Sequence, residues 1–246
     1  MSENLPTYEA LLPSLPATIL KILGADAPSF IPSPIQPIAD KFSGNVNRII
    51  FIMLDNLGLF EITYYKPQFL IEKADAIILL STKNPYTLGV MHQLLFGGFE
   101  YEPQGFHLLR SLNNAGLETV MVGREKDLNR YKGNTTALSK DTDMATWIEA
   151  AKVINRFRFS LIHFLDFEQL YRSKTRLKQD TPEELIEKLI KRTDKWLLSI
   201  YKQARSKTLM IILGNHGRYK IDLNYQGRIA EWRKASVPIG LLIYKQ

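Results

Sequence analysis

The sequence predicts an α/β protein with a mostly parallel sheet, helices on both faces and no large cap domain. From residue 48 onward, short runs rich in Ile, Leu and Val alternate with longer helical patterns. Strands that alternate with helices are typical of a parallel sheet with crossover connections. The expected strands are 48–54, 76–80, 118–122, 159–164, 208–213 and 238–244, and the expected helices are 87–96, 105–115, 141–157 and 182–205.

Capping residues support several of these boundaries. Gly116 follows the helix expected at 105–115, where glycine commonly ends a helix. Asp141 and Thr142 form an N-cap region, and Thr181-Pro-Glu-Glu reads as a capping box with proline at the first helical position. The polar segment 123–140 is expected to be a loop that could cover a site.

The N-terminal 47 residues differ from the rest of the chain. They have no clear apolar period, and six prolines divide them into short pieces: Pro13, Pro16, Pro28, Pro32, Pro34 and Pro37. Only 16–23 reads as a short helix. We therefore expect residues 1–47 to be a proline-rich arm packed on the domain, and 48–246 to be a single α/β domain.

Composition narrows the class of protein and of partner. Cysteine is absent, which excludes disulfides, thiolate metal sites and cysteine nucleophiles. No apolar run approaches the ~20 residues of a membrane span, and the N-terminus does not read as a signal peptide, so a cytoplasmic protein with no membrane partner is expected. The formal net charge of +7 suits an anionic ligand, and nucleic acid is a further candidate supported only by charge.

Polar residues follow three of the expected strands. Asp55 ends the first strand and is followed by a turn with Gly58. A second group, His163, Asp166, Glu168 and Arg172, lies at or just after the end of the fourth strand, and Asn215 and His216 follow the fifth. Ligands bind beyond the carboxyl ends of strands in open α/β sheets, so these groups are expected to converge. Helix capping by Asp55 or Asp166, and a hydrogen-bonded core position for His163, are the structural alternatives.

Thr87 is a fourth candidate. It precedes an apolar helical run that ends at Gly97. A hydroxyl at a helix N-terminus lies among free backbone N–H groups and at the positive end of the helix dipole. This position would suit an oxygen nucleophile that attacks phosphorus, although the spacing alone favours an ordinary threonine N-cap.

Taken in order, these motifs resemble the alkaline phosphatase superfamily, in particular its type I phosphodiesterase and nucleotide pyrophosphatase branch. The matching pieces are Leu-Asp-x-Leu-Gly at 54–58, a threonine ten residues before Gly97, His-Phe-x-Asp-x-Glu at 163–168 and Leu-Gly-Asn-His-Gly at 213–217. The resemblance implies an alkaline phosphatase-like fold. It also implies that Asp55, Asn215 and His216 occupy one metal site, that Asp166 and Glu168 match acidic metal ligands, and that Thr87 is the nucleophile.

Several positions depart from that family pattern. Asn215 stands where the family has aspartate, Glu168 where it has aspartate, and Arg172 where it has a histidine ligand. A guanidinium does not bind metals but grips phosphate oxygens. The family's late histidine is also missing, with residues 223–228 in its place. We therefore expect at most one divalent metal (Zn, Mn or Mg), with the second site lost and Arg172 holding the phosphate.

Two functions follow from this pattern. The chain is either a metal-dependent phosphoesterase or phosphodiesterase that acts through Thr87 on a phosphate-ester small molecule, or a catalytically inactive relative (a pseudoenzyme) that binds an anionic ligand or partner. The sequence does not specify the substrate or the oligomeric state.

Overall fold

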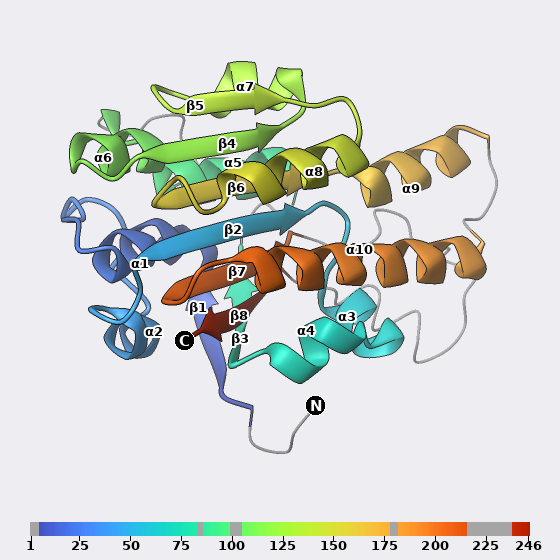
Figure 1. Cartoon of the computed structure of the whole chain (residues 1–246), viewed down its shortest axis with the longest axis horizontal. Coiled ribbons are helices and arrows are strands. Elements are labelled where there is room, and N and C mark those ends of the chain that lie inside the picture. The colour runs from blue at the N-terminus through green and yellow to red at the C-terminus, as the bar shows by residue number, and fades with distance from the viewer. Residues whose placement is uncertain (1–4, 83–85, 99–104, 178–181, 216–237) are drawn as a thin grey trace.

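The computed structural model describes residues 5–82, 86–98, 105–177, 182–215 and 238–246, with the backbone alone at 174–176. Its centre is an eight-stranded sheet in the order β1-β3-β8-β7-β2-β6-β4-β5 (Figure 1). β8 is antiparallel to both of its neighbours, and the other strand pairs are parallel. The predicted mostly parallel α/β sheet is therefore confirmed.

The six predicted strands all form, within about a residue of their expected bounds. The strands are β1 (Thr7–Leu11), β2 (Arg48–Leu54), β3 (Ala76–Ser81), β4 (Thr119–Gly123), β5 (Thr136–Ser139), β6 (Phe159–Phe164), β7 (Thr208–Gly214) and β8 (Ile239–Lys245). β2 lies between β7 and β6, and its side chains are almost entirely buried. A run of β-branched and large apolar residues is what such a doubly covered position requires.

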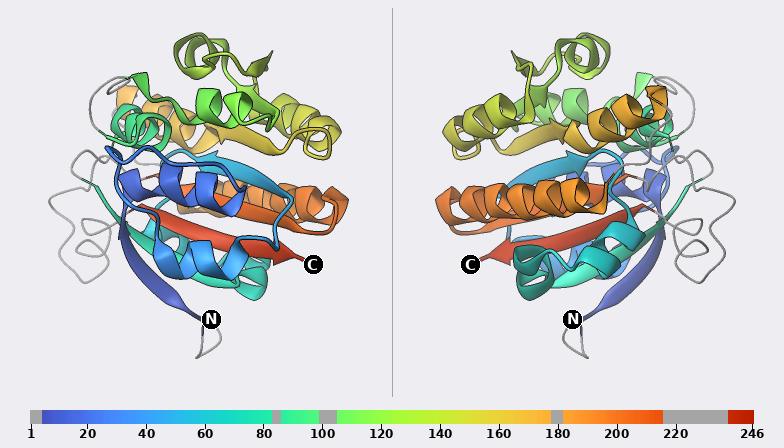
Figure 2. Two further views of the ribbon diagram at one scale, coloured as in Figure 1. Left: turned by 90° about the vertical axis from the view of Figure 1, so that its left-hand side faces the viewer. Right: turned by 90° about the vertical axis from the view of Figure 1, so that its right-hand side faces the viewer.

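Helices cover both faces of the sheet (Figure 2). On one face Phe51 and Met53 of β2 pack in a core with η1 (Leu12–Ser14), α1 (Leu15–Ile22), α2 (Gln36–Phe42), α5 (Thr87–Phe96), α6 (Leu108–Asn114) and α7 (Glu125–Tyr131). On the other face Ile52 and Leu54 pack with α3 (Leu59–Tyr65), α4 (Gln68–Lys73), α8 (Asp143–Val153), α9 (Asp166–Arg176) and α10 (Glu183–Gln203). Alternate residues of one strand thus serve two separate cores.

Two of the capping predictions are confirmed, whereas the placement of Pro182 at the first helical position is wrong by one residue. The hydroxyl of Thr142 accepts a hydrogen bond from the backbone N–H of Ala145 at 3.2 Å, which makes Thr142 the N-cap of α8. Gly116 follows α6 with a φ of +75°. α10 begins at Glu183 with Pro182 as its N-cap residue, and Thr181 lies outside the described residues.

Two segments carry more regular structure than the sequence analysis assigned to them. Residues 123–140 do not form a loop throughout, because they contain α7 and β5. The arm at 1–47 contributes β1, which pairs with β3 at one edge of the sheet, as well as α1 and α2. Both added strands are short edge strands with several exposed positions, so their sequences lack the apolar runs of the central strands.

Candidate functional site

The site lies at the carboxyl edge of β2 and β7. Leu54 and Gly214 are register partners, so the residues that follow them, Asp55 and Asn215, lie side by side. A Cβ at Gly214 would stand 2.1 Å from the backbone oxygen of Leu57. Glycine at the end of β7 therefore allows the turn after Asp55 to approach the neighbouring strand.

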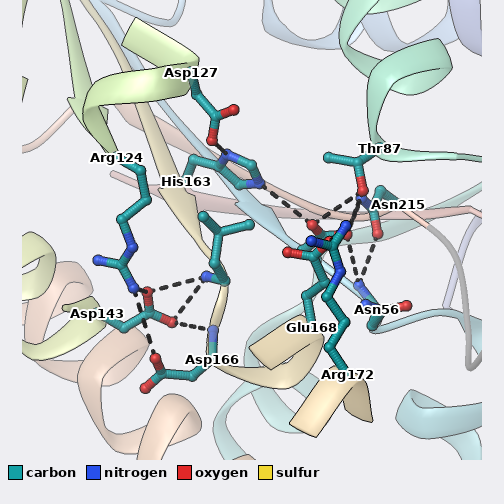
Figure 3. A network of polar contacts seen from close by, with 12 residues as sticks. Asn56, Thr87, Arg124, Asp127, Asp143, His163, Asp166, Glu168, Arg172 and Asn215 are labelled. Carbon is teal, nitrogen blue, oxygen red and sulfur yellow. Dashed lines mark hydrogen bonds and ion pairs between the residues drawn. The ribbon is translucent and has the colours of Figure 1, made fainter. Parts of the chain in front are cut away.

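Asp55 is fully buried and accepts hydrogen bonds from several neutral donors (Figure 3). The Asn215 amide nitrogen donates to its Oδ1 at 2.6 Å, and the Thr87 hydroxyl lies 2.8 and 3.0 Å from its two oxygens. The backbone N–H of Asn56 adds a bond of 3.0 Å. Asn56 has a φ of +56°, a left-handed conformation that asparagine tolerates better than most residues. These donors stabilise a carboxylate that is removed from water.

The orientation of the Asn215 amide follows from the same network. Its Oδ1 accepts from the backbone N–H of Asn56 at 3.0 Å. A backbone N–H can only donate, so the oxygen must face Asn56 and the NH₂ group must face Asp55. The Asn215 nitrogen that faces Asp55 has no lone pair to offer a metal, and the amide oxygen points toward the backbone of Asn56.

The described residues therefore do not fit a metal centre of the expected kind. Within the part of the chain that the structure describes, no group of three His, Asp or Glu side chains could hold a metal ion. The predicted pair of Asp55 and Asn215 is close together, but Asn215 presents a donor to Asp55 instead of a second ligand oxygen. His216, the third predicted ligand, lies outside the described residues.

Thr87 lies where the sequence analysis placed it, at the first position of α5 with Tyr86 as the N-cap residue. Its hydroxyl, together with the Asp55 carboxylate, lines a cleft of about 340 Å³ between α5, α7 and α9. The helix N-terminus favours negative charge at this end of the cleft. The structure thus brings the predicted nucleophile and the predicted first ligand into direct contact.

Glu168 and Arg172 of α9 line the same cleft. They are one helical turn apart and form an ion pair. The pKa of Glu168 is raised, first because the side chain is partly buried and then because Asp55 is negative, while Arg172 opposes the shift. The Arg172 side chain is 66% exposed, lines the cleft and uses one guanidinium nitrogen for Glu168, so its guanidinium has further N–H donors to offer a ligand.

Asp166 does not join this group. Its carboxylate lies 2.5 Å from the guanidinium of Arg192 and 3.8 Å from that of Arg124. Figure 3 shows it beside Asp143 and Arg124, apart from Thr87 and Asn215. The prediction that Asp166 is a metal ligand receives no support from this position.

Sequence analysis missed two residues that bear on the site, Asp127 and Asp143. Asp127 lies within the segment 123–140 that was expected to be a loop, and Asp143 lies just after it. Asp127 of α7 lies 3.2 Å from Nδ1 of His163, whose Nε2 is 4.0 Å from Asp55. Burial alone would lower the pKa of His163, but Asp127 and Asp55 together raise it. The core position expected for His163 is confirmed, since its side chain is 1% exposed. The one sequence signal of α7 was the spacing of Leu128 and Tyr131, both buried, which is too short a pattern to identify a helix.

The second missed feature is a buried cluster around Asp143. Its carboxylate accepts from the backbone N–H groups of Leu165 and Asp166 at the start of α9 and pairs with Arg124 at 3.0 Å. Burial raises the pKa of Asp143, an effect that the hydrogen bond from Leu165 opposes. This cluster fixes the N-terminus of the helix that carries Glu168 and Arg172.

Comparison with known proteins identifies the fold. No protein-family model matches the sequence, and no curated protein matches it. A protein in the alkaline phosphatase superfamily from Vibrio parahaemolyticus matches 95% of this chain and 69% of its own, at 10% identity and a TM-score of 0.55. The chain has the alkaline phosphatase-like fold.

Two further solved structures agree with this alkaline phosphatase-like fold. The C-terminal periplasmic domain of EptC from Escherichia coli, in complex with Zn, matches 82% of this chain and 74% of its own, with 13% identity and a TM-score of 0.56. The lipoteichoic acid synthase LtaP from Listeria monocytogenes matches 92% and 71%, with 11% identity and a TM-score of 0.57. The resemblance seen in the motifs is therefore confirmed at the level of the fold.

Proposed function

We propose that this chain binds a phosphate ester in the cleft beside Thr87 and that it does so without a metal ion. The observation that carries the proposal is the hydrogen-bonded Asp55, whose neighbours Asn215, Asn56 and Thr87 supply donors where a metal-dependent relative would supply ligands around an ion. Asp55 then needs no metal to remain buried.

Thr87 and Arg172 would bind the phosphate group. Arg172 presents several donors in a planar fork that matches phosphate oxygens, and the N-terminus of α5 favours negative charge. Glu168 would keep Arg172 oriented, since the two side chains already form an ion pair. The neighbour LtaP is a synthase of lipoteichoic acid and EptC is known in complex with Zn, so we expect an oxyanion ester as ligand here but a different dependence on metal.

Hydrolysis through Thr87 is a second candidate, favoured by one contact. The Thr87 hydroxyl donates to Asp55, so Asp55 would be placed to receive its proton as the oxygen attacked phosphorus. The P–O bond to the ester alcohol would break, the alcohol would leave with a proton from water, and a second water would release phosphate from Thr87. Without a metal, the negative charge that develops in transfer would be stabilised mainly by Arg172 and the helix N-terminus. We therefore expect any turnover to be slow. A cytoplasmic location and a nucleic-acid partner stay predictions.

Calorimetric titration with phenyl phosphate, with and without EDTA, tests the proposal. We expect the same affinity in both conditions. Arg172→Gln should weaken binding about tenfold or more, as expected for loss of a charged hydrogen bond worth about 1.5–3 kcal/mol. Arg192→Gln is the matched control, because Arg192 pairs with Asp166 and does not line this cleft. Absence of binding, or binding only with added Zn²⁺ or Mn²⁺, would contradict the proposal.

The same preparations would be assayed with p-nitrophenyl phosphate and its bis ester. Release of nitrophenolate that is lost in Thr87→Ala would favour the hydrolytic candidate. Release that is equal in wild type and Thr87→Ala would exclude Thr87 as the nucleophile.

A further inference from the structure

The charges around the cleft are unevenly compensated. Arg124 is paired with Asp143 and Asp166. Arg172 is likewise paired with Glu168. The remaining cations that line the cleft are Lys126 and Arg130 of α7. Within the part of the chain that the structure describes, neither is paired with a carboxylate, and Asp127 between them turns to His163.

α7 holds these two cations firmly on one side. Lys126 and Arg130 are four residues apart and therefore lie on one face of the helix. Leu128 and Tyr131 anchor α7 in the core, and the Arg130 guanidinium lies over the Tyr131 ring at 5.6 Å. Both cations are exposed to solvent, so a ligand can reach them.

The cleft is larger than one phosphate group needs. Its volume of about 340 Å³ falls in the range of small-molecule sites, roughly 300–1,000 Å³. Figure 3 shows its walls: Thr87 comes from α5, Asp127 from α7, and Glu168 and Arg172 from α9. Tyr86 and Leu88 flank Thr87 and are 53% and 44% exposed, which offers apolar surface to an organic group.

We infer that the ligand is an ester with two anionic groups joined by an organic linker. This inference rests on the proposed function: one phosphate lies at Thr87 and Arg172, and the second anionic group is held by Lys126 and Arg130 on the opposite wall. The charges on α7, which form no ion pair among the described residues, and the apolar side chains beside Thr87 together select such a molecule over inorganic phosphate or a simple monoester.

The test compares phenyl phosphate with hydroquinone bisphosphate and hexane-1,6-diol bisphosphate, a rigid and a flexible probe. We expect at least one bisphosphate to bind about tenfold or more tightly than phenyl phosphate. The double variant Lys126→Gln/Arg130→Gln should remove this gain and leave the affinity for phenyl phosphate within about twofold. Lys191→Gln/Lys195→Gln on α10 is the control, since it removes two exposed cations with the same spacing outside the cleft.

Each outcome decides between the two claims. If phenyl phosphate binds but neither bisphosphate binds more tightly, the inference is overturned and the proposed function stands. The inference is also overturned if the α10 control loses as much of the gain as the α7 variant, because the effect is then one of overall charge. If no probe binds the wild-type protein, both the proposed function and the inference fail.

Discussion

Two buried carboxylates at the same edge of the sheet show how differently one residue type can be used. Asp55 is 0% exposed and Asp143 is 2% exposed, and each accepts several hydrogen bonds. Asp143 receives backbone N–H groups at the N-terminus of α9 and the guanidinium of Arg124. Asp55 receives an amide, a hydroxyl and a backbone N–H. Asp143 has a paired guanidinium and a helix end to offset its charge. The hydrogen bonds described for Asp55 come from neutral donors, and the His163 ring lies 4.0 Å from it.

This difference separates a structural role from a functional one. A carboxylate whose donors include a paired arginine and the start of a helix fixes those elements in place. Asp55, in contrast, lines a cleft and holds the Thr87 hydroxyl. A ligand that enters this cleft would meet the Asp55–Thr87 pair directly. We therefore expect substitutions around Asp143 to affect stability and substitutions around Asp55 to affect ligand or metal binding.

Asp143→Ala should have the largest effect. It leaves the buried N–H of Leu165, the partly buried N–H of Asp166 and the Arg124 guanidinium without their acceptor. Removing one partner of a buried ion pair costs about 3–5 kcal/mol. Urea unfolding monitored by circular dichroism would measure the loss. Asp166→Ala is the control and should cost less, since the Asp166 side chain is 23% exposed. Equal losses in the two variants would contradict a structural role special to Asp143.

Asn215→Asp should make the stability of the protein depend on a bound metal ion at Asp55. The new carboxylate would face Asp55 in place of the NH₂ group, so a hydrogen bond becomes a repulsion. We expect a loss of about 3 kcal/mol in EDTA, from an unsatisfied buried group and the added like charge. Zn²⁺ or Mn²⁺ should restore part of it.

Thermal unfolding and metal analysis of both proteins measure this change. Wild type should show no shift in Tm on adding metal, and it should take up no stoichiometric metal. A wild-type protein that binds one equivalent of Zn²⁺ would contradict our account of Asn215, whereas Asn215→Gln should be destabilised and remain insensitive to metal.

The convergence of Asp55, Thr87 and Asn215 could be predicted because the sequence determines it locally. Each residue directly follows a long apolar strand or begins a helix that follows one, and parallel strands bring their carboxyl ends to one edge. Glu168 and Arg172 joined them because a helix repeats every 3.6 residues, which places both on one face of α9.

The contacts of Asp127 and Asp143 could not be predicted in the same way. α7 has seven residues, and only Leu128 and Tyr131 are buried in it, which is too short an apolar period to distinguish from a loop. Asp143 lies within the helix expected at 141–157 and was given no role of its own, because its partners lie more than twenty residues away at Leu165 and Asp166. The orientation of the Asn215 amide could not be predicted either, because it depends on the backbone N–H of Asn56, which is distant in sequence.

Gly214→Ala should displace the turn that follows Asp55 without changing any charge. The added Cβ would meet the backbone oxygen of Leu57 at 2.1 Å, and a backbone atom cannot move aside cheaply. We expect a loss of about 1–3 kcal/mol, as for other overpacked sites, together with weaker binding of phenyl phosphate. Gly240→Ala on the adjacent strand β8 is the control, because its nearest contact is a side chain at 3.5 Å. Unfolding curves that coincide for Gly214→Ala and wild type would contradict the close approach.

Thr87→Val should have the smallest effect on stability. The substitution keeps the shape of the side chain and removes its hydrogen bond to Asp55, which retains Asn215 and Asn56 as donors. We expect a loss of about 1 kcal/mol, and none in Thr87→Ser if the hydroxyl keeps its place. A double-mutant cycle with Asp55→Asn separates the pair from other effects of the change.

If Thr87 acts through Asp55, the cost of Thr87→Val should shrink in the Asp55→Asn background, and phenyl phosphate binding should fall in both single variants. Additive losses would instead show that the stability effect of Thr87 does not depend on Asp55. The same cycle built on Asp143→Asn should show no coupling to Thr87, because the Asp143 cluster holds the start of α9 and makes no contact with the hydroxyl.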